Sequence, residues 1–254
     1  MLATRVVPTL LLKNTGLVKG VKFCNHQYVG DPINAVKIFN DKEVDELVFL
    51  DITATIDGRE PNYELIEDIA SQAFMPFSYG GGIKTIPQIE RIFSLGVEKI
   101  ILNTSACEDI SLVRQAAKIT GSQSIVVSID VKKNLFGNYR VFSRSGKLDT
   151  KRDPVEYAKE LADFGVGEIM LNSIDNDGNG KGYDLKLVQS ISEAVGVPVI
   201  ASCGAGQLSH FKDAVDAGAS AVAAGSMFVF HGKHKAVLIT YPEYKELTKT
   251  FKGN

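Results

Sequence analysis

Short apolar runs alternate with longer amphipathic segments along the whole chain. Each run holds four to eight residues and is rich in valine, isoleucine and leucine, which is typical of strands buried in a parallel sheet. The pattern predicts eight strands, near residues 5–11, 47–52, 76–80, 98–103, 124–131, 168–173, 198–202 and 221–224.

The segments between these runs carry apolar residues at three- and four-residue spacing, as amphipathic helices do. Several begin with a capping residue followed by proline, such as Asp31-Pro32 and Asp153-Pro154, and several end near a glycine such as Gly96. The predicted helices cover residues 33–42, 62–72, 86–95, 110–118, 155–164, 185–195 and 209–217.

Eight strand–helix units in 254 residues match the size of an α/β fold of the (β/α)8, or TIM barrel, type. A doubly wound open sheet is the alternative, although it usually has fewer strands. The two halves of the chain also repeat each other at an offset close to 122 residues. Neither half can close alone, so the repeat predicts one barrel domain over residues 1–254, with half-barrels at about 1–122 and 123–240. The matched segments are 49–51 with 170–172, 79–82 with 201–204, and 102–105 with 224–227.

Two long polar segments, residues 14–32 and 134–153, follow the strands at 5–11 and 124–131. Both therefore lie at the carboxyl ends of strands, where barrels place their chemistry. Long loops in this position often cover a site, so we expect two lid loops.

Two glycine-rich turns, residues 80–82 and 203–206, each follow a strand and precede a helix. Glycine lets backbone N–H groups approach an anion, and helix N-termini favour negative charge. One such turn could simply be tight, but two related by the repeat predict a ligand with a phosphate at each end. The candidate residues are Gly82, Asn103 and Thr104 at one site and Gly204, Gly225 and Ser226 at the other.

Acids and amides also occur at strand ends. Asp130 ends the buried run 124–131, and the repeat places Leu11 at the equivalent position of the first half. A carboxylate there is costly to bury, which makes Asp130 a candidate general acid or base. Some of the others could be structural carboxylates that cap a loop. The full set is Asp51, Asn103, Asp130, Asn172 and Asp177.

Composition excludes several classes of partner and site. A net charge of −2 gives no overall footprint for nucleic acid or an anionic membrane, and no apolar run approaches the length of a membrane span, so we expect a cytoplasmic protein. Cys24, Cys107 and Cys203 are odd in number and widely spaced, as reduced thiols would be. His231 and His234 lack further ligands nearby, so we expect no metal and no cofactor.

The segments VKGVKF, SYGGGI, SIDVK and IASCGAG resemble the HisF family, the cyclase subunits of imidazole glycerol phosphate synthase. The resemblance runs from residue 1 to about 230. It implies a (β/α)8 barrel that pairs with a glutaminase of the HisH type. Ammonia from glutamine would enter the floor of the barrel, pass through its core, and react at the top with a bis-phosphorylated ribonucleotide to give imidazole glycerol phosphate and an aminoimidazole carboxamide ribonucleotide.

The resemblance also implies residue roles. Asp130 would be one of two catalytic aspartates, Lys19 a substrate contact on a mobile loop, and Asp51 and Asp177 supports of the cavity. Four charged residues would form the ammonia gate in the floor, where mutual pairing offsets their burial. These are Arg5, Glu46, Lys99 and Glu168.

The chain departs from the family at the other end of the barrel. Leu11 stands where the family has its second catalytic aspartate, and leucine cannot transfer protons. Further departures are Thr9, Leu10, Asn14, Asn172, Cys203 and Lys151.

An intact gate at the floor and a damaged site at the top suggest a HisF-like paralogue that lacks one catalytic aspartate. Such a chain would dock a HisH-like glutaminase and channel ammonia to a different acceptor, as in paralogues associated with acetamidino-sugar synthesis for surface polysaccharide, where a sugar amidotransferase is a third partner. Two alternatives remain: a working cyclase that uses Asp130, and a sugar-phosphate isomerase of the sister family.

Overall fold

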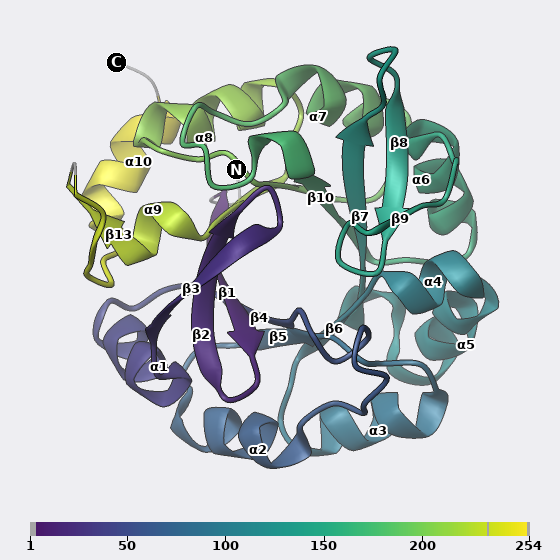
Figure 1. The fold of residues 1–254 in the computed structure, drawn as a ribbon, viewed down its shortest axis with the longest axis horizontal. Coiled ribbons are helices and arrows are strands. Elements are labelled where there is room, and N and C mark those ends of the chain that lie inside the picture. The colour runs from purple at the N-terminus through teal and green to yellow at the C-terminus, as the bar shows by residue number, and fades with distance from the viewer. Residues whose placement is uncertain (1–3, 233, 253–254) are drawn as a thin grey trace.

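Eight parallel strands close into a barrel in the computed structural model, which describes residues 4–232 and 234–252 (Figure 1). Each strand pairs with the next along the chain, and β12 pairs with β1 through Arg5 opposite Ala221. The predicted (β/α)8 barrel is confirmed, and the open-sheet alternative is wrong. The barrel strands are β1 (Arg5–Lys13), β4 (Leu47–Asp51), β5 (Phe77–Gly80), β6 (Lys99–Leu102), β7 (Ile125–Lys133), β10 (Glu168–Ser173), β11 (Val199–Ser202) and β12 (Ala221–Ala224).

All seven predicted helices lie outside the barrel. Their starts follow the capping signals in the sequence, since the Asp31 carboxylate accepts from the backbone N–H of Asn34 and Asp153 accepts from that of Val155. The helices are α1 (Pro32–Asp41), α2 (Tyr63–Gln72), α3 (Ile86–Ser94), α5 (Ser111–Thr120), α6 (Pro154–Asp163), α7 (Leu185–Ser192) and α8 (Leu208–Asp216).

Several short elements were not expected. Two of them, α4 (Thr104–Glu108) and α9 (Ser226–Val229), follow β6 and β12 at repeat-related positions. The chain ends in α10 (Tyr244–Lys252), and before it the Tyr241 hydroxyl donates to the Val6 carbonyl at 2.9 Å. Within the described residues no helix is both long and apolar enough to cross a lipid bilayer. The remaining short elements are η1 (Ser122–Ser124), η2 (Ile174–Asn176), β13 (Phe230–His231) and β14 (Ala236–Val237).

The expected lid loops are instead antiparallel strands. β1 and β7 run past the rim of the barrel and leave edges that the following segments pair with. Residues 14–32 contain β2 (Gly16–Val21) and β3 (Cys24–Gly30), and residues 134–153 contain β8 (Tyr139–Ser143) and β9 (Leu148–Asp149). The prediction of irregular loops is wrong because Leu17, Val18 and Val141 are buried and stabilise the added strands.

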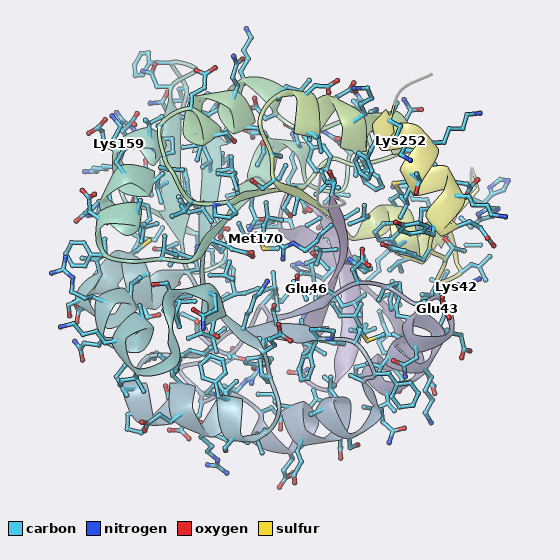
Figure 2. The ribbon with its side chains drawn as sticks, turned by 180° about the vertical axis from the view of Figure 1, so that it is seen from behind. Lys42, Glu43, Glu46, Lys159, Met170 and Lys252 are labelled. Carbon is cyan, nitrogen blue, oxygen red and sulfur yellow. The ribbon has the colours of Figure 1, made fainter. Side chains whose placement is uncertain are left out.

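The barrel interior has an apolar core of its own, separate from the larger core under the helices. Met170 is fully buried, and the view from the floor shows it near the barrel axis (Figure 2). Side chains alternate along a strand, so the inward positions two residues beyond Val7, Val126 and Ile200 fall on polar residues. These are Thr9, Ser128 and Ser202. The inner core consists of Val7, Val48, Ile101, Val126, Met170, Ile200, Ala221 and Ala223.

Substitution of Phe49 tests how much the core under the helices contributes to stability. It is fully buried and meets Phe77 edge to face, with ring centroids 6.1 Å apart. We expect Phe49→Ala to lower the free energy of unfolding by about 3–5 kcal/mol, because it removes both the burial and the aromatic contact. Urea denaturation measures the change. Phe74→Ala is the matched control, since Phe74 is 88% exposed, and a similar loss there would contradict the assignment of the core.

Candidate functional site

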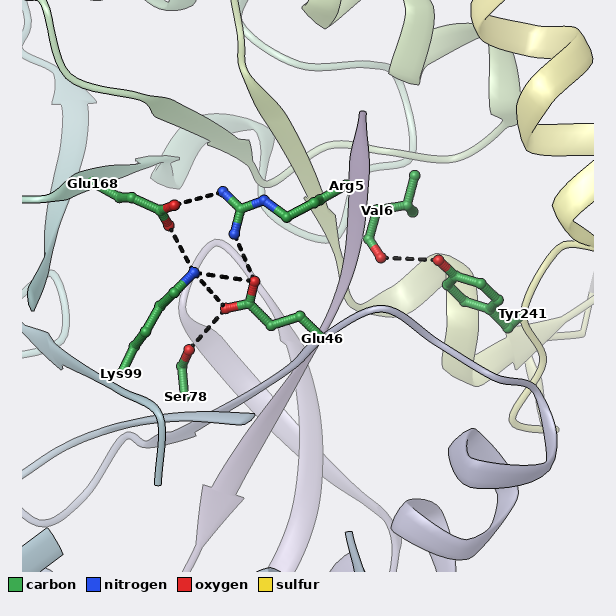
Figure 3. A network of polar contacts seen from close by, with 7 residues as sticks. All are labelled: Arg5, Val6, Glu46, Ser78, Lys99, Glu168 and Tyr241. Atoms are coloured by element: carbon green, nitrogen blue, oxygen red, sulfur yellow. Dashed lines mark hydrogen bonds and ion pairs between the residues drawn. The ribbon is translucent and has the colours of Figure 1, made fainter. Parts of the chain in front are cut away.

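Four charged side chains form a closed ring at the floor of the barrel (Figure 3). The Arg5 guanidinium bridges both carboxylates, at 2.6 Å from Glu46 and 2.7 Å from Glu168. Lys99 Nζ reaches the same two carboxylates at 3.4 and 3.3 Å, and the Ser78 hydroxyl donates to Glu46 at 2.9 Å. The structure therefore brings together the four residues of the predicted gate.

Mutual pairing keeps this ring charged. The side chains of Glu46, Lys99 and Glu168 are only 7, 13 and 13% exposed, so each needs a counter-ion. Burial by itself would lower the pKa of Arg5, but the two carboxylates reverse the effect and its pKa is raised overall. The ring has two positive and two negative members, and no charge is left uncompensated.

The inner apolar core lies directly above the ring. Its members are aliphatic side chains and one methionine. An ion would lose its hydration there at a large cost, whereas a small neutral molecule would lose much less. Thr9 adds a hydroxyl oxygen that is buried and has no hydrogen-bond partner among the described residues.

A cavity of about 330 Å³ opens at the other end of the barrel. It is lined by the carboxyl ends of the barrel strands together with the two added hairpins. Every residue predicted for the upper site lines this cavity: Leu11, Lys19, Asp51, Gly82, Asn103, Thr104, Asp130, Asn172, Asp177, Gly204, Gly225 and Ser226.

Asp130 is the buried acid of the cavity and lies in a small hydrogen-bond network. Its Oδ1 accepts from the Ser128 hydroxyl at 3.0 Å and from Asn172 Nδ2 at 2.8 Å. Burial raises the pKa of Asp130 to about 6, and the two hydrogen bonds oppose that rise. A carboxyl with this pKa can both give and take a proton near neutral pH.

Asp51 has a structural role in this cavity. Its Oδ1 accepts from the backbone N–H groups of Thr53 and Ala54 and lies 2.7 Å from Arg59 Nη2. These contacts hold the loop after β4 in place. Asp51 is therefore a carboxylate that caps a loop, which was one of the two roles that the sequence allowed for it. Asp177 accepts from the N–H of Phe23 at 3.1 Å and ties the β2–β3 turn to the barrel, and burial raises its pKa.

Lys19 lies on β2 and is buried. Its Nζ donates to the carbonyl of Thr9 and lies over Gly225. Burial lowers the pKa of Lys19 to about 8, although Asp177 opposes the shift. The side chain therefore reaches the cavity from an ordered strand.

The glycine turns are close packed. A Cβ on Gly81 would lie 2.4 Å from the Asp51 carbonyl, and one on Gly204 would lie 2.2 Å from that of Gly182. Both glycines also have positive φ. Tight packing thus explains why these positions are glycine. In the first turn the Thr104 hydroxyl accepts from the N–H of Arg144 at 3.0 Å, so the β8–β9 turn covers this candidate phosphate site.

Apart from Lys19, the sequence did not identify the cavity residues that come from the hairpins, because their positions depend on how the hairpins fold back. It also missed Ser128 and Ser202, although their inward spacing from Asp130 and Gly204 was a usable signal. Among the described residues no group of three or more His, Cys, Asp and Glu could hold a metal ion, and His231 and His234 are exposed. Besides Lys19, the hairpin residues that line the cavity are Lys13, Gly20, Phe23, His26, Ser145 and Lys147.

Residues 5–235 match the family described as "Histidine biosynthesis protein". The chain belongs to this family. It is of the HisF type, since its relatives carry that name. A Pseudomonas aeruginosa protein with the provisional name imidazole glycerol phosphate synthase subunit hisF2 is 57% identical and covers 97% of this chain and 99% of its own length.

Two further relatives show how widely this HisF type extends. A Vibrio vulnificus protein, provisionally named subunit hisF3 of the same enzyme, is 50% identical over 98% of this chain and 96% of its own. The imidazole glycerol phosphate synthase subunit HisF of Campylobacter concisus is 46% identical over 90% of both chains. HisF subunits pair with a HisH glutaminase in imidazole glycerol phosphate synthase.

Leu11 contributes to the wall of the upper cavity. It lies beside Leu50 in the β1–β4 register, and both side chains line the cavity with Ile101. This part of the wall is therefore aliphatic.

Cys203 lies in the second glycine-rich turn and has φ +71°. Burial keeps the pKa of its thiol well above the usual range, so the thiol stays protonated.

Asp130 makes stability depend on pH. Its pKa is about 6 in the folded chain against 3.8 in the reference state, so the folded chain binds more protons between these values and loses stability as pH rises through them. We expect the stability of Asp130→Asn relative to the unchanged chain to rise from pH 4 to pH 7 by on the order of 3 kcal/mol. Urea melts at each pH measure this, and a constant difference would contradict it.

Proposed function

We propose that this HisF-type chain docks a HisH-type glutaminase at its floor and conducts ammonia through the barrel to an acceptor other than the histidine precursor. One observation carries the proposal: a complete, paired ring lies at the floor, while the top has Leu11 where the resemblance to the family implies a proton-transfer group. Burying four ions costs desolvation free energy unless all four stay paired. In a chain that had lost all function, nothing would select for retaining such a set.

The interior supports conduction of a neutral molecule. Above the ring the lumen is lined by valine, isoleucine, alanine and methionine, which disfavour ammonium but not ammonia. The hydroxyls of Thr9, Ser128 and Ser202 follow, and they could bind ammonia as it leaves the apolar layer.

The acceptor we favour is an acetamido sugar that a partner enzyme converts to the acetamidino form for surface polysaccharide. The amidotransfer would then take place on that partner. In this arrangement the barrel supplies nitrogen and Asp130 has no second acid to work with. Loss of a general acid or base commonly costs about 10²–10⁴ in rate, so any remaining cyclase activity would be slow.

A working cyclase of histidine biosynthesis is the second candidate, because the cavity keeps Asp130 and both glycine turns. Asp51 is a poor replacement for the missing acid since Arg59 and two backbone N–H groups occupy its Oδ1. Asp177 remains as a possible helper. A sugar-phosphate isomerase would have no use for the floor ring.

Glutaminase stimulation tests the docking step. We expect the purified chain to raise glutamine hydrolysis by a HisH-type glutaminase, and Arg5→Ala to reduce that stimulation about tenfold, because it leaves Glu46 and Glu168 facing one cation. Lys22→Ala is the control, since Lys22 is exposed in the β2–β3 turn at the opposite end of the barrel and makes no ion pair among the described residues. Absence of any stimulation would reject the proposal.

Complementation separates the two acceptors. In a strain that lacks its cyclase, we expect this chain to give no growth without histidine, because the second proton-transfer group is absent. Leu11→Asp restores a carboxylate beside Leu50 and should recover measurable cyclase activity if the rest of the cavity is competent. Leu11→Asn, which is polar but cannot transfer a proton at neutral pH, is the matched control. Growth with the unchanged chain would favour the cyclase.

A further inference from the structure

Charge is strongly segregated in this chain. Residues 13–30 and 132–152 together carry ten lysines and arginines and one acid, Asp149, whereas the rest of the chain has 18 basic and 29 acidic residues. The basic segments are the two hairpins that extend β1 and β7 beyond the barrel. The net charge of −2 therefore hides two basic hairpins at the carboxyl ends of the strands.

Many of these basic side chains form no ion pair within the described chain and could pair with acidic groups of another molecule. Only Lys133, Arg144 and Arg152 of the second hairpin form ion pairs with carboxylates in the described chain. The other exposed lysines have none. They are Lys13, Lys22, Lys132, Lys147 and Lys151.

The tip of the β7–β8 hairpin presents two apolar side chains to solvent. Leu135 is 102% exposed and Phe136 is 89% exposed. The turn that carries them is ordered by its own hydrogen bonds, because Asn134 Oδ1 accepts from the N–H groups of Phe136 and Asn138. The tip is thus a preorganised apolar element, and preorganisation lowers the cost of binding.

The same hairpins form the mouth of the cavity. Phe23 of the β2–β3 turn and Ser145 of the β8–β9 turn line it, and a Cβ on Gly146 would lie 3.2 Å from the Phe23 ring. The Ser145 hydroxyl also donates to the Ile52 carbonyl at 2.8 Å, so the turn reaches across to β4. From this mouth the β7–β8 hairpin extends to the outer edge of the ring of helices (Figure 1).

We propose that the two hairpins dock the protein that carries the ammonia acceptor, through an acidic surface on that protein and an apolar pocket for Leu135 and Phe136. This inference rests on the proposed function and names the place of the third partner. Two arguments favour a protein. The basic hairpins line the cavity mouth, where an acceptor enzyme must sit to receive ammonia before water protonates it. An exposed aromatic side chain next to an aliphatic one is also typical of the buried centre of protein interfaces.

Site-specific cross-linking in the source organism tests the docking surface. Benzoylphenylalanine replaces Phe136 in the full chain, and in a second strain it replaces Tyr244, a 71% exposed aromatic residue on α10. We expect irradiation to link position 136, but not position 244, to one sugar-modifying amidotransferase through an acidic peptide, identified by mass spectrometry. Adducts at 136 with lipid, nucleic acid or the glutaminase, or no adduct, would overturn the proposal.

Binding measurements with the purified cross-linked protein give the second readout. Leu135→Asp with Phe136→Asp should weaken binding by at least about tenfold, whereas Tyr244→Asp should leave it unchanged. Added salt should also weaken binding of the unchanged chain. Glutaminase stimulation by the double variant should equal that of the unchanged chain, which shows that the barrel is folded. If stimulation is normal but binding is insensitive to the tip, only the docking surface fails; if the unchanged chain never stimulates a glutaminase, the proposed function fails instead.

Discussion

The pairing of two cations with two carboxylates at the floor of the barrel is the interaction on which the rest of this structure depends. Arg5 and Glu46 lie at the start of the first half, and Glu168 lies in the second half, so the ring joins strands that are far apart in sequence. Each ion is buried enough to need its neighbours. The ring therefore closes the barrel below, and an apolar layer separates it from the polar groups of the upper cavity.

The ionisable groups at the upper end of the barrel are not paired in this way. Its buried acid and buried lysine both shift toward their neutral forms, because burial raises the pKa of Asp130 to about 6 and lowers that of Lys19 to about 8. Leu11 adds an aliphatic wall rather than a second acid. A neutral nitrogen source would meet few groups here that could trap it as an ion, which fits a path that ends at an acceptor outside the barrel.

The two hairpins line the opening of the upper cavity. They exist because β1 and β7 continue past the barrel rim and offer free edges for pairing. Their basic residues and the exposed tip lie at the end of the molecule where the cavity opens. The two ends of the barrel thus carry different kinds of charged groups. At the floor two buried cations pair with two buried carboxylates, whereas the hairpins at the top carry exposed lysines without a carboxylate partner.

The sequence by itself determined the barrel, the seven outer helices and the set of residues at strand ends, because the period of apolar residues and the half-repeat follow directly from local geometry. Only the tertiary structure decided what those residues do. It showed that Arg59 engages Asp51, that Ser128 and Asn172 hold Asp130, and that the two polar segments are strands. These facts depend on contacts between segments distant in sequence, and neither residue type nor spacing determines which partners meet when a barrel closes.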